Sequence, residues 1–107
     1  QQIDVRALYE TSALAGHPLA MRELGRILRR SAATTTEVAE STQWFASAAD
    51  QGDVPAMVDL AQALVFGIGI EPSREQAQQW LARAAEAGDE TAQMLTNSMA
   101  LRPQVTQ

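Results

Sequence analysis

The sequence contains no cysteine and no lysine, and it has few aromatic residues. The absence of cysteine excludes disulfides, thiolate metal sites and a cysteine nucleophile. Aromatic residues make up only 5% of the 107-residue chain although hydrophobic residues reach 46%, and much of that apolar content is alanine. Alanine favours helices, whereas strands are enriched in β-branched and aromatic residues. The composition therefore predicts an all-α domain.

Long apolar runs and an excess of positive charge are missing as well. No segment approaches the roughly 20 apolar residues that cross a bilayer, and no basic start leads into an apolar stretch, so we expect no membrane span. The net charge is −5, and residues 37–72 contain six acidic residues and no basic one. Because nucleic-acid phosphates require clustered positive charge, the charge balance argues against nucleic-acid binding.

A single unit is repeated about three times along the chain. Gly16, Gly52 and Gly88 lie 36 residues apart, and the residues around each glycine recur with it. Trp44 and Trp80 keep the same register and are expected to pack in the core between units. A fixed period of this length is typical of stacked helical arrays.

Each unit is predicted to contain two helices joined by a tight turn. In residues 77–85 the apolar positions follow the i, i+3, i+4, i+7, i+8 spacing of one helix face. Asp53 and Asp89 follow their glycines as expected N-caps of the second helix, and His17 takes that place ahead of Pro18. We expect one domain over residues 1–107, with antiparallel helix pairs at about 4–30, 37–66 and 73–101 and a C-terminal tail at 102–107.

The clearest copy of the pattern lies between residues 52 and 88. Its positions are Gly52, Ala56, Leu60, Gly67, Gly69, Ile70, Ala77, Trp80, Ala84, Ala85 and Gly88. In this order they resemble Sel1-like repeats, which are related to tetratricopeptide repeats but have a longer period and a Gly-x-Gly loop. The resemblance covers roughly residues 4–101, and the copy at 16–52 lacks the Gly-x-Gly loop. It implies an α/α-solenoid of about three antiparallel helix pairs in a right-handed superhelix.

The resemblance also implies a function, because members of this family mostly act as adaptors or scaffolds. It implies a non-catalytic module that binds a partner protein or peptide in a concave groove, without a cofactor or a metal. Two alternatives remain open: a module that binds or hydrolyses a small molecule or cell-wall ligand, and a structural or self-associating segment of a larger protein. The resemblance favours a soluble bacterial protein in the periplasm over one in the cytoplasm, and it leaves the oligomeric state open.

Two groups of polar residues are candidate partner-binding sites. The helical spacing of Arg22, Arg26, Arg29 and Arg30 predicts one cluster on the outer face of the second helix of the first unit. Such a cluster could hold an acidic peptide, a phosphate or an anionic lipid through bidentate hydrogen bonds, or it could be a solvated face near the helix C-terminus. By analogy with other solenoids, the first helices of the units line the concave groove, which suits an extended peptide. The expected groove residues are Glu40, Gln43, Ser47, Gln76, Gln79 and Arg83.

The sequence carries no recognisable catalytic motif. His17 is the only histidine, and its place at an interhelical turn favours a capping position over a relay or a metal site. The acidic pair of Asp50 and Asp53 recurs as Glu86 and Asp89, which indicates caps and a solvated rim and not a catalytic dyad. Nucleophile-elbow, P-loop and dinucleotide glycine patterns are missing. We therefore expect no enzymatic activity.

Overall fold

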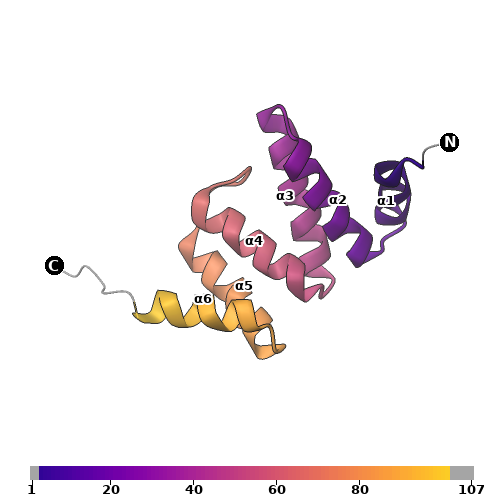
Figure 1. Ribbon diagram of the computed structural model, residues 1–107. Coiled ribbons are helices and arrows are strands. Elements are labelled where there is room, and N and C mark those ends of the chain that lie inside the picture. The colour runs from indigo at the N-terminus through magenta and orange to yellow at the C-terminus, as the bar shows by residue number, and fades with distance from the viewer. Residues whose placement is uncertain (1–2, 102–107) are drawn as a thin grey trace.

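The structure is a computed structural model that describes residues 3–101, and these residues form six α-helices (Figure 1). The helices are α1 (Val5–Leu14), α2 (Pro18–Ser31), α3 (Thr35–Asp50), α4 (Val54–Phe66), α5 (Arg74–Glu86) and α6 (Glu90–Leu101). Each helix packs chiefly on the next one in the chain, so the molecule is elongated, with extents of 60 × 30 × 20 Å. The prediction of an all-α solenoid of three helix pairs is confirmed. The expected tail at 102–107 lies outside the described residues.

The turns inside the three helix pairs follow one local design. Gly16, Gly52 and Gly88 have φ values of 96°, 95° and 98°, a left-handed conformation that glycine adopts without a Cβ clash. The residue after each glycine is the N-cap of the second helix of the pair. Asp53 accepts a hydrogen bond from the Ala56 amide at 3.0 Å, and Asp89 accepts one from the Ala92 amide at 2.8 Å. Both predicted N-caps are therefore confirmed.

His17 occupies the corresponding place in the first pair but does not act as a cap through its side chain. It is the N-cap residue of α2 by position, and Pro18 follows at the first helical position as expected. Its imidazole makes no capping hydrogen bond, and the residue is exposed. Proline suits this first helical position, since its missing N–H is one of the first-turn donors that have no partner within the helix.

The two loops between pairs differ, as the missing glycine in the first one predicts. The loop after α2 is short, and Thr34 caps α3 in a capping box with Glu37. Helix α3 therefore begins at Thr35, two residues before the expected start. The loop after α4 instead turns at Gly67 and Gly69, both with φ of 69°, and folds back onto the start of α3.

Small residues and leucines form the core, as expected for helices that approach closely. Its best buried members are Leu24, Leu28, Ala48, Ala49, Ala56, Leu64, Ala77, Leu81, Ala84 and Ala92. Trp44 and Trp80 pack against this core but remain half-buried at its edge, so they are less enclosed than the sequence predicts. The Arg83 guanidinium lies 4.6 Å from the centre of the Trp80 ring and covers part of its face.

Candidate functional site

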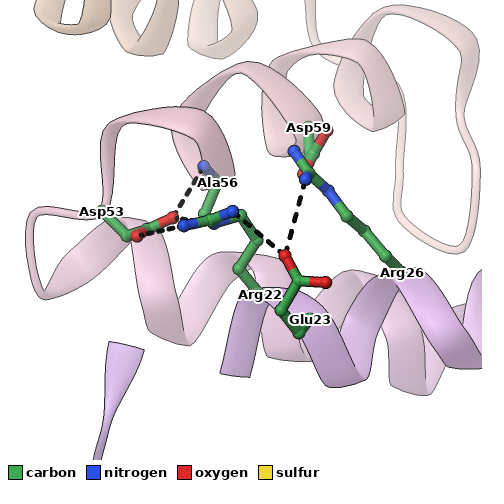
Figure 2. Close-up of polar contacts among 6 residues, drawn as sticks. All are labelled: Arg22, Glu23, Arg26, Asp53, Ala56 and Asp59. Carbon is green, nitrogen blue, oxygen red and sulfur yellow. Dashed lines mark hydrogen bonds and ion pairs between the residues drawn. The ribbon is translucent and has the colours of Figure 1, made fainter. Parts of the chain in front are cut away.

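The arginines of α2 are tied to acidic residues of the next unit. Arg22 Nε lies 2.7 Å from Asp53 Oδ2, and Arg26 Nε lies 2.9 Å from Asp59 Oδ2. Glu23 lies between the two arginines, with its Oε2 at 3.1 Å from Arg22 Nη1 and 3.7 Å from Arg26 Nη1. Figure 2 shows the resulting chain of charges, which runs from α2 to the start and the middle of α4.

Arg29 is bound to α3 instead of α4. Its Nε donates to Ser41 Oγ at 2.9 Å and its Nη2 to Thr42 Oγ1 at 2.6 Å, while its guanidinium carbon lies 5.3 Å from the centre of the Phe45 ring. Burial lowers the pKa of Arg29, and the charge of Asp59 opposes that effect. The Thr42 hydroxyl in turn donates to the carbonyl oxygen of Ile68 at 2.7 Å, so it links Arg29 to the loop after α4.

The prediction that the arginine cluster lies on an outer face is therefore wrong for Arg22, Arg26 and Arg29. The spacing does place them on one side of α2, but α3 and α4 stack against that side. Arg30 alone of the four is exposed. The sequence did contain a sign of these ion pairs between units, because the basic first unit precedes a second unit with six acidic residues and no basic one. A partner-binding role for these arginines remains a prediction.

The expected groove residues are largely open to solvent. Glu40, Gln43, Gln76, Gln79 and Arg83 are exposed, and Ser47 is half-buried. They occupy equivalent positions on α3 and α5, one repeat apart. Within residues 3–101, none of their side chains forms a hydrogen bond or an ion pair, although Arg83 stacks on Trp80. Their joint role in binding a partner remains a prediction.

Sequence reasoning missed a pair of equivalent hollows, each located between successive second helices of the repeat. The first has a volume of about 200 Å³ and lies between α2 and α4; its lining is Arg26, Arg29, Arg30, Phe45, Asp59 and Gln62. The second has about 300 Å³ and lies one repeat later; its lining is Ala61, Gln62, Val65, Phe66, Arg74, Leu81, Leu95 and Met99. A shift of 36 residues replaces Arg29, Arg30 and Asp59 by Val65, Phe66 and Leu95, so a charged hollow becomes an apolar one.

The two hollows differ in the ionisable residues that line them. His17 lines neither of them, and the second contains no carboxylate. Across the part of the chain that the structure describes, no group of three or more His, Asp or Glu residues could hold a metal ion. Over the same residues, every helix is too short or too polar to cross a bilayer.

The comparisons with known proteins agree with the repeat pattern. The Sel1 repeat family matches residues 18–53 and 54–89, about two thirds of the chain. A Sel1 repeat protein from Oxalobacter formigenes is 27% identical, with a TM-score of 0.78 over 84% of this chain and 68% of its own. A protective antigen of uropathogenic Escherichia coli that displays an SLR fold is 31% identical, with a TM-score of 0.82 over 88% of this chain.

The chain spans 20% of the length of the Escherichia coli antigen and 68% of that of the Oxalobacter protein. None of the curated proteins matches the sequence. The family match extends over both central units, and the helices, the turn glycines and the N-caps follow the same period. This chain therefore belongs to the Sel1 repeat family.

Proposed function

We propose that residues 1–107 act as one non-catalytic domain that binds an extended segment of a partner protein along the exposed side of α3 and α5. The observation that carries this proposal is the repetition of exposed polar side chains on the two helices. Gln43 and Gln79 occupy equivalent positions, and both amides face solvent without an intramolecular partner among residues 3–101. An extended peptide presents N–H and C=O groups at regular intervals, which such amides can bind.

The neighbouring residues support the same function. Glu40 and Gln76 lie three residues before these amides, and Ser47 and Arg83 lie four residues after them. Each helix therefore offers an acceptor, an amide and a further donor along one side. Arg83 is already held over the Trp80 ring, so less side-chain freedom is lost when it binds a ligand.

A hydrolytic function receives less support. The apolar hollow at α4, α5 and α6 has a volume at the lower end of the usual range for ligand pockets, and Arg74 is its one charged lining residue. It offers no acid, base or nucleophile among its lining side chains. Peptide binding to the α3–α5 side therefore fits the residues better than chemistry in this hollow.

The proposal can be tested with a displayed library of random peptides selected on the 107-residue chain. Peptides that bind are measured again on the variant Gln43→Ala/Gln79→Ala/Arg83→Ala, whose changes are confined to exposed positions. The matched control is Gln62→Ala/Gln78→Ala, which also removes exposed amides but from other faces of α4 and α5. We expect the first variant to bind about tenfold more weakly or worse and the control to bind normally. Equal binding to both variants, or a failure to select any peptide, would overturn the proposal.

A further inference from the structure

The charged hollow between α2 and α4 carries more positive than negative charge. Its ionisable lining residues are three arginines and one carboxylate, which gives the lining a net charge of +2: Arg26, Arg29, Arg30 and Asp59. None of the lining residues belongs to α1, α5 or α6. The hollow therefore lies inside the stack of helices, and its composition does not depend on further units at either end.

Arg26 neutralises the one carboxylate of the lining. Its Nε lies 2.9 Å from Asp59 Oδ2, and the Asp59 side chain is only 19% exposed. Arg29 and Arg30 form no ion pair among residues 3–101. The excess positive charge of the hollow therefore belongs to these two arginines at the end of α2.

Arg29 is held in place by groups that leave its charge uncompensated. Its Nε and Nη2 donate to the neutral hydroxyls of Ser41 and Thr42, and its guanidinium stacks on the Phe45 ring. Burial disfavours the charged form of this side chain and lowers its pKa, an effect that Asp59 only opposes from a distance. A bound anion would offset that cost, and little side-chain freedom would be lost on binding because the guanidinium is already fixed.

The stacking of the repeats does not require these charges. Val65 and Phe66 occupy the equivalent places one unit later, where the helices pack in the same order and enclose an apolar hollow. The helix dipole accounts for only part of the charge. Arg29 and Arg30 lie in the last turn of α2, where the dipole is equivalent to about half a negative charge. Two cations exceed that need.

We propose that this hollow binds a phosphate monoester group, with Arg29 and Arg30 as its charged donors and the Gln62 amide as a neutral donor from α4. A phosphate monoester carries about 1.5 to 2 negative charges at pH 7 and accepts several hydrogen bonds, which matches two guanidinium groups without a carboxylate. Gln62 is exposed, and its side chain forms no hydrogen bond among residues 3–101.

The phosphate group is that of a free small molecule or of a modified side chain, since both present the same chemistry to the arginines. The site shares no residue with the peptide-binding surface proposed for α3 and α5. The two proposals are therefore tested independently, and failure of one leaves the other intact.

The first test adds sodium phosphate to the 107-residue chain at constant ionic strength and follows NMR shifts. The signals are those of the backbone amides, the arginine Nε–H groups and the glutamine side-chain amides. We expect saturable shifts at Arg29, Arg30 and Gln62, because phosphate is held by these donors. Shifts that rise without saturation, or that spread evenly over all the arginines, would overturn the proposal.

Variants of exposed residues make the test specific. Arg30→Gln should weaken phosphate binding about tenfold. The matched control is Arg74→Gln, which removes the same charge from an exposed arginine of the apolar hollow and should bind phosphate normally. Asp59→Asn should act in the opposite direction and tighten binding, because it removes the one carboxylate of the lining. Equal weakening by Arg30→Gln and Arg74→Gln would overturn the proposal, because phosphate would then respond to net charge alone.

A short peptide with one phosphoserine, and the same peptide without its phosphate, distinguish the two sources. Tighter binding of the phosphopeptide than of inorganic phosphate would support the site and assign it to a modified protein. Equal or weaker binding would support the site and assign it to a free phosphate monoester. The unphosphorylated peptide should cause no shifts at Arg29 or Arg30. Equal shifts with both peptides, or no saturable shift with either phosphate probe, would overturn the proposal.

Discussion

Arg22 of α2 and Asp53 at the N-cap of α4 form an ion pair at 2.7 Å, and the same carboxylate accepts the Ala56 amide at 3.0 Å. One side chain therefore starts a helix and joins two repeat units (Figure 2). The side chains of Arg22 and Asp53 are only 15% and 11% exposed. Removing either partner would leave the other charge poorly solvated and unpaired, which costs more than the pair contributes.

Asp53→Ala should lower the free energy of unfolding by about 2–4 kcal/mol, because it removes the cap and leaves Arg22 without its partner. The repeat supplies a matched control. Asp89 is the equivalent cap of α6, but Val58 stands where Arg22 stands one unit earlier, so Asp89→Ala should cost only about 1 kcal/mol. Urea denaturation of both variants measures the difference. Equal losses would show that the ion pair adds nothing to the cap.

The close packing of Gly25 against the Phe45 ring gives a second prediction. A Cβ on residue 25 would lie 2.7 Å from the Phe45 ring, closer than atoms pack, so the ring or the helix must move. Gly25→Ala should therefore destabilise the protein by about 1–2 kcal/mol, even though alanine improves helix propensity by roughly 1 kcal/mol.

A double-mutant cycle separates this contact from other effects. The double variant Gly25→Ala/Phe45→Leu reproduces the combination of Ala61 and Leu81 found in the next unit. It should therefore be more stable than the sum of the two single changes by about 1 kcal/mol. Strict additivity in thermal or urea unfolding would show that the Gly25–Phe45 contact does not limit the size of residue 25.

Gly69 should tolerate substitution less well than the turn glycines. Its φ is 69°, and a Cβ would lie 2.8 Å from both the Ala39 Cα and the Val38 carbonyl oxygen, backbone atoms that cannot rotate away. Gly88 also has a positive φ, but nothing lies within 4 Å of the Cβ position. We expect Gly88→Ala to cost about 1–2 kcal/mol and Gly69→Ala about 3 kcal/mol. Similar melting temperatures for the two variants would show that the loop moves away from α3 at little cost.

The repeat period made the fold predictable from the sequence. A residue that recurs every 36 positions must serve the same structural role in each copy, which is why the glycine turns and the Asp53 and Asp89 caps were assigned correctly. Local rules suffice for such features because the partners lie within a few residues.

The side-chain contacts between units were harder to predict. Helical spacing showed that Arg22, Arg26 and Arg29 share one side of α2, but it did not show which helix packs against that side. Those contacts link residues such as Arg22 and Asp53, which lie 31 positions apart. Comparison of the copies with one another would have helped, because the arginines of the first unit become Val58, Gln62 and Val65 in the second, and the partner Asp59 becomes Leu95.

The capping box of α3 predicts an acid-sensitive contribution to stability. The Glu37 carboxylate accepts the Ala33 amide at 2.8 Å and the Thr34 amide at 3.1 Å, and the Ala33 hydrogen bond is the main reason that the pKa of Glu37 lies below its ordinary value. Since the folded state favours the ionised form, its contribution is complete above the pKa of an unfolded glutamate. It is lost as the pH falls through the lowered pKa of the folded state.

Glu37→Gln should therefore destabilise the protein at neutral pH and have a smaller effect in acid, because protonation removes the same charge from the original residue. Urea denaturation of both proteins at a series of pH values measures the difference. Glu40→Gln is the control, since Glu40 is exposed on the same helix and its carboxylate accepts no hydrogen bond within residues 3–101. A Glu37→Gln effect that stayed constant down to the acid limit would mean that the shape of the side chain, and not its charge, stabilises the start of α3.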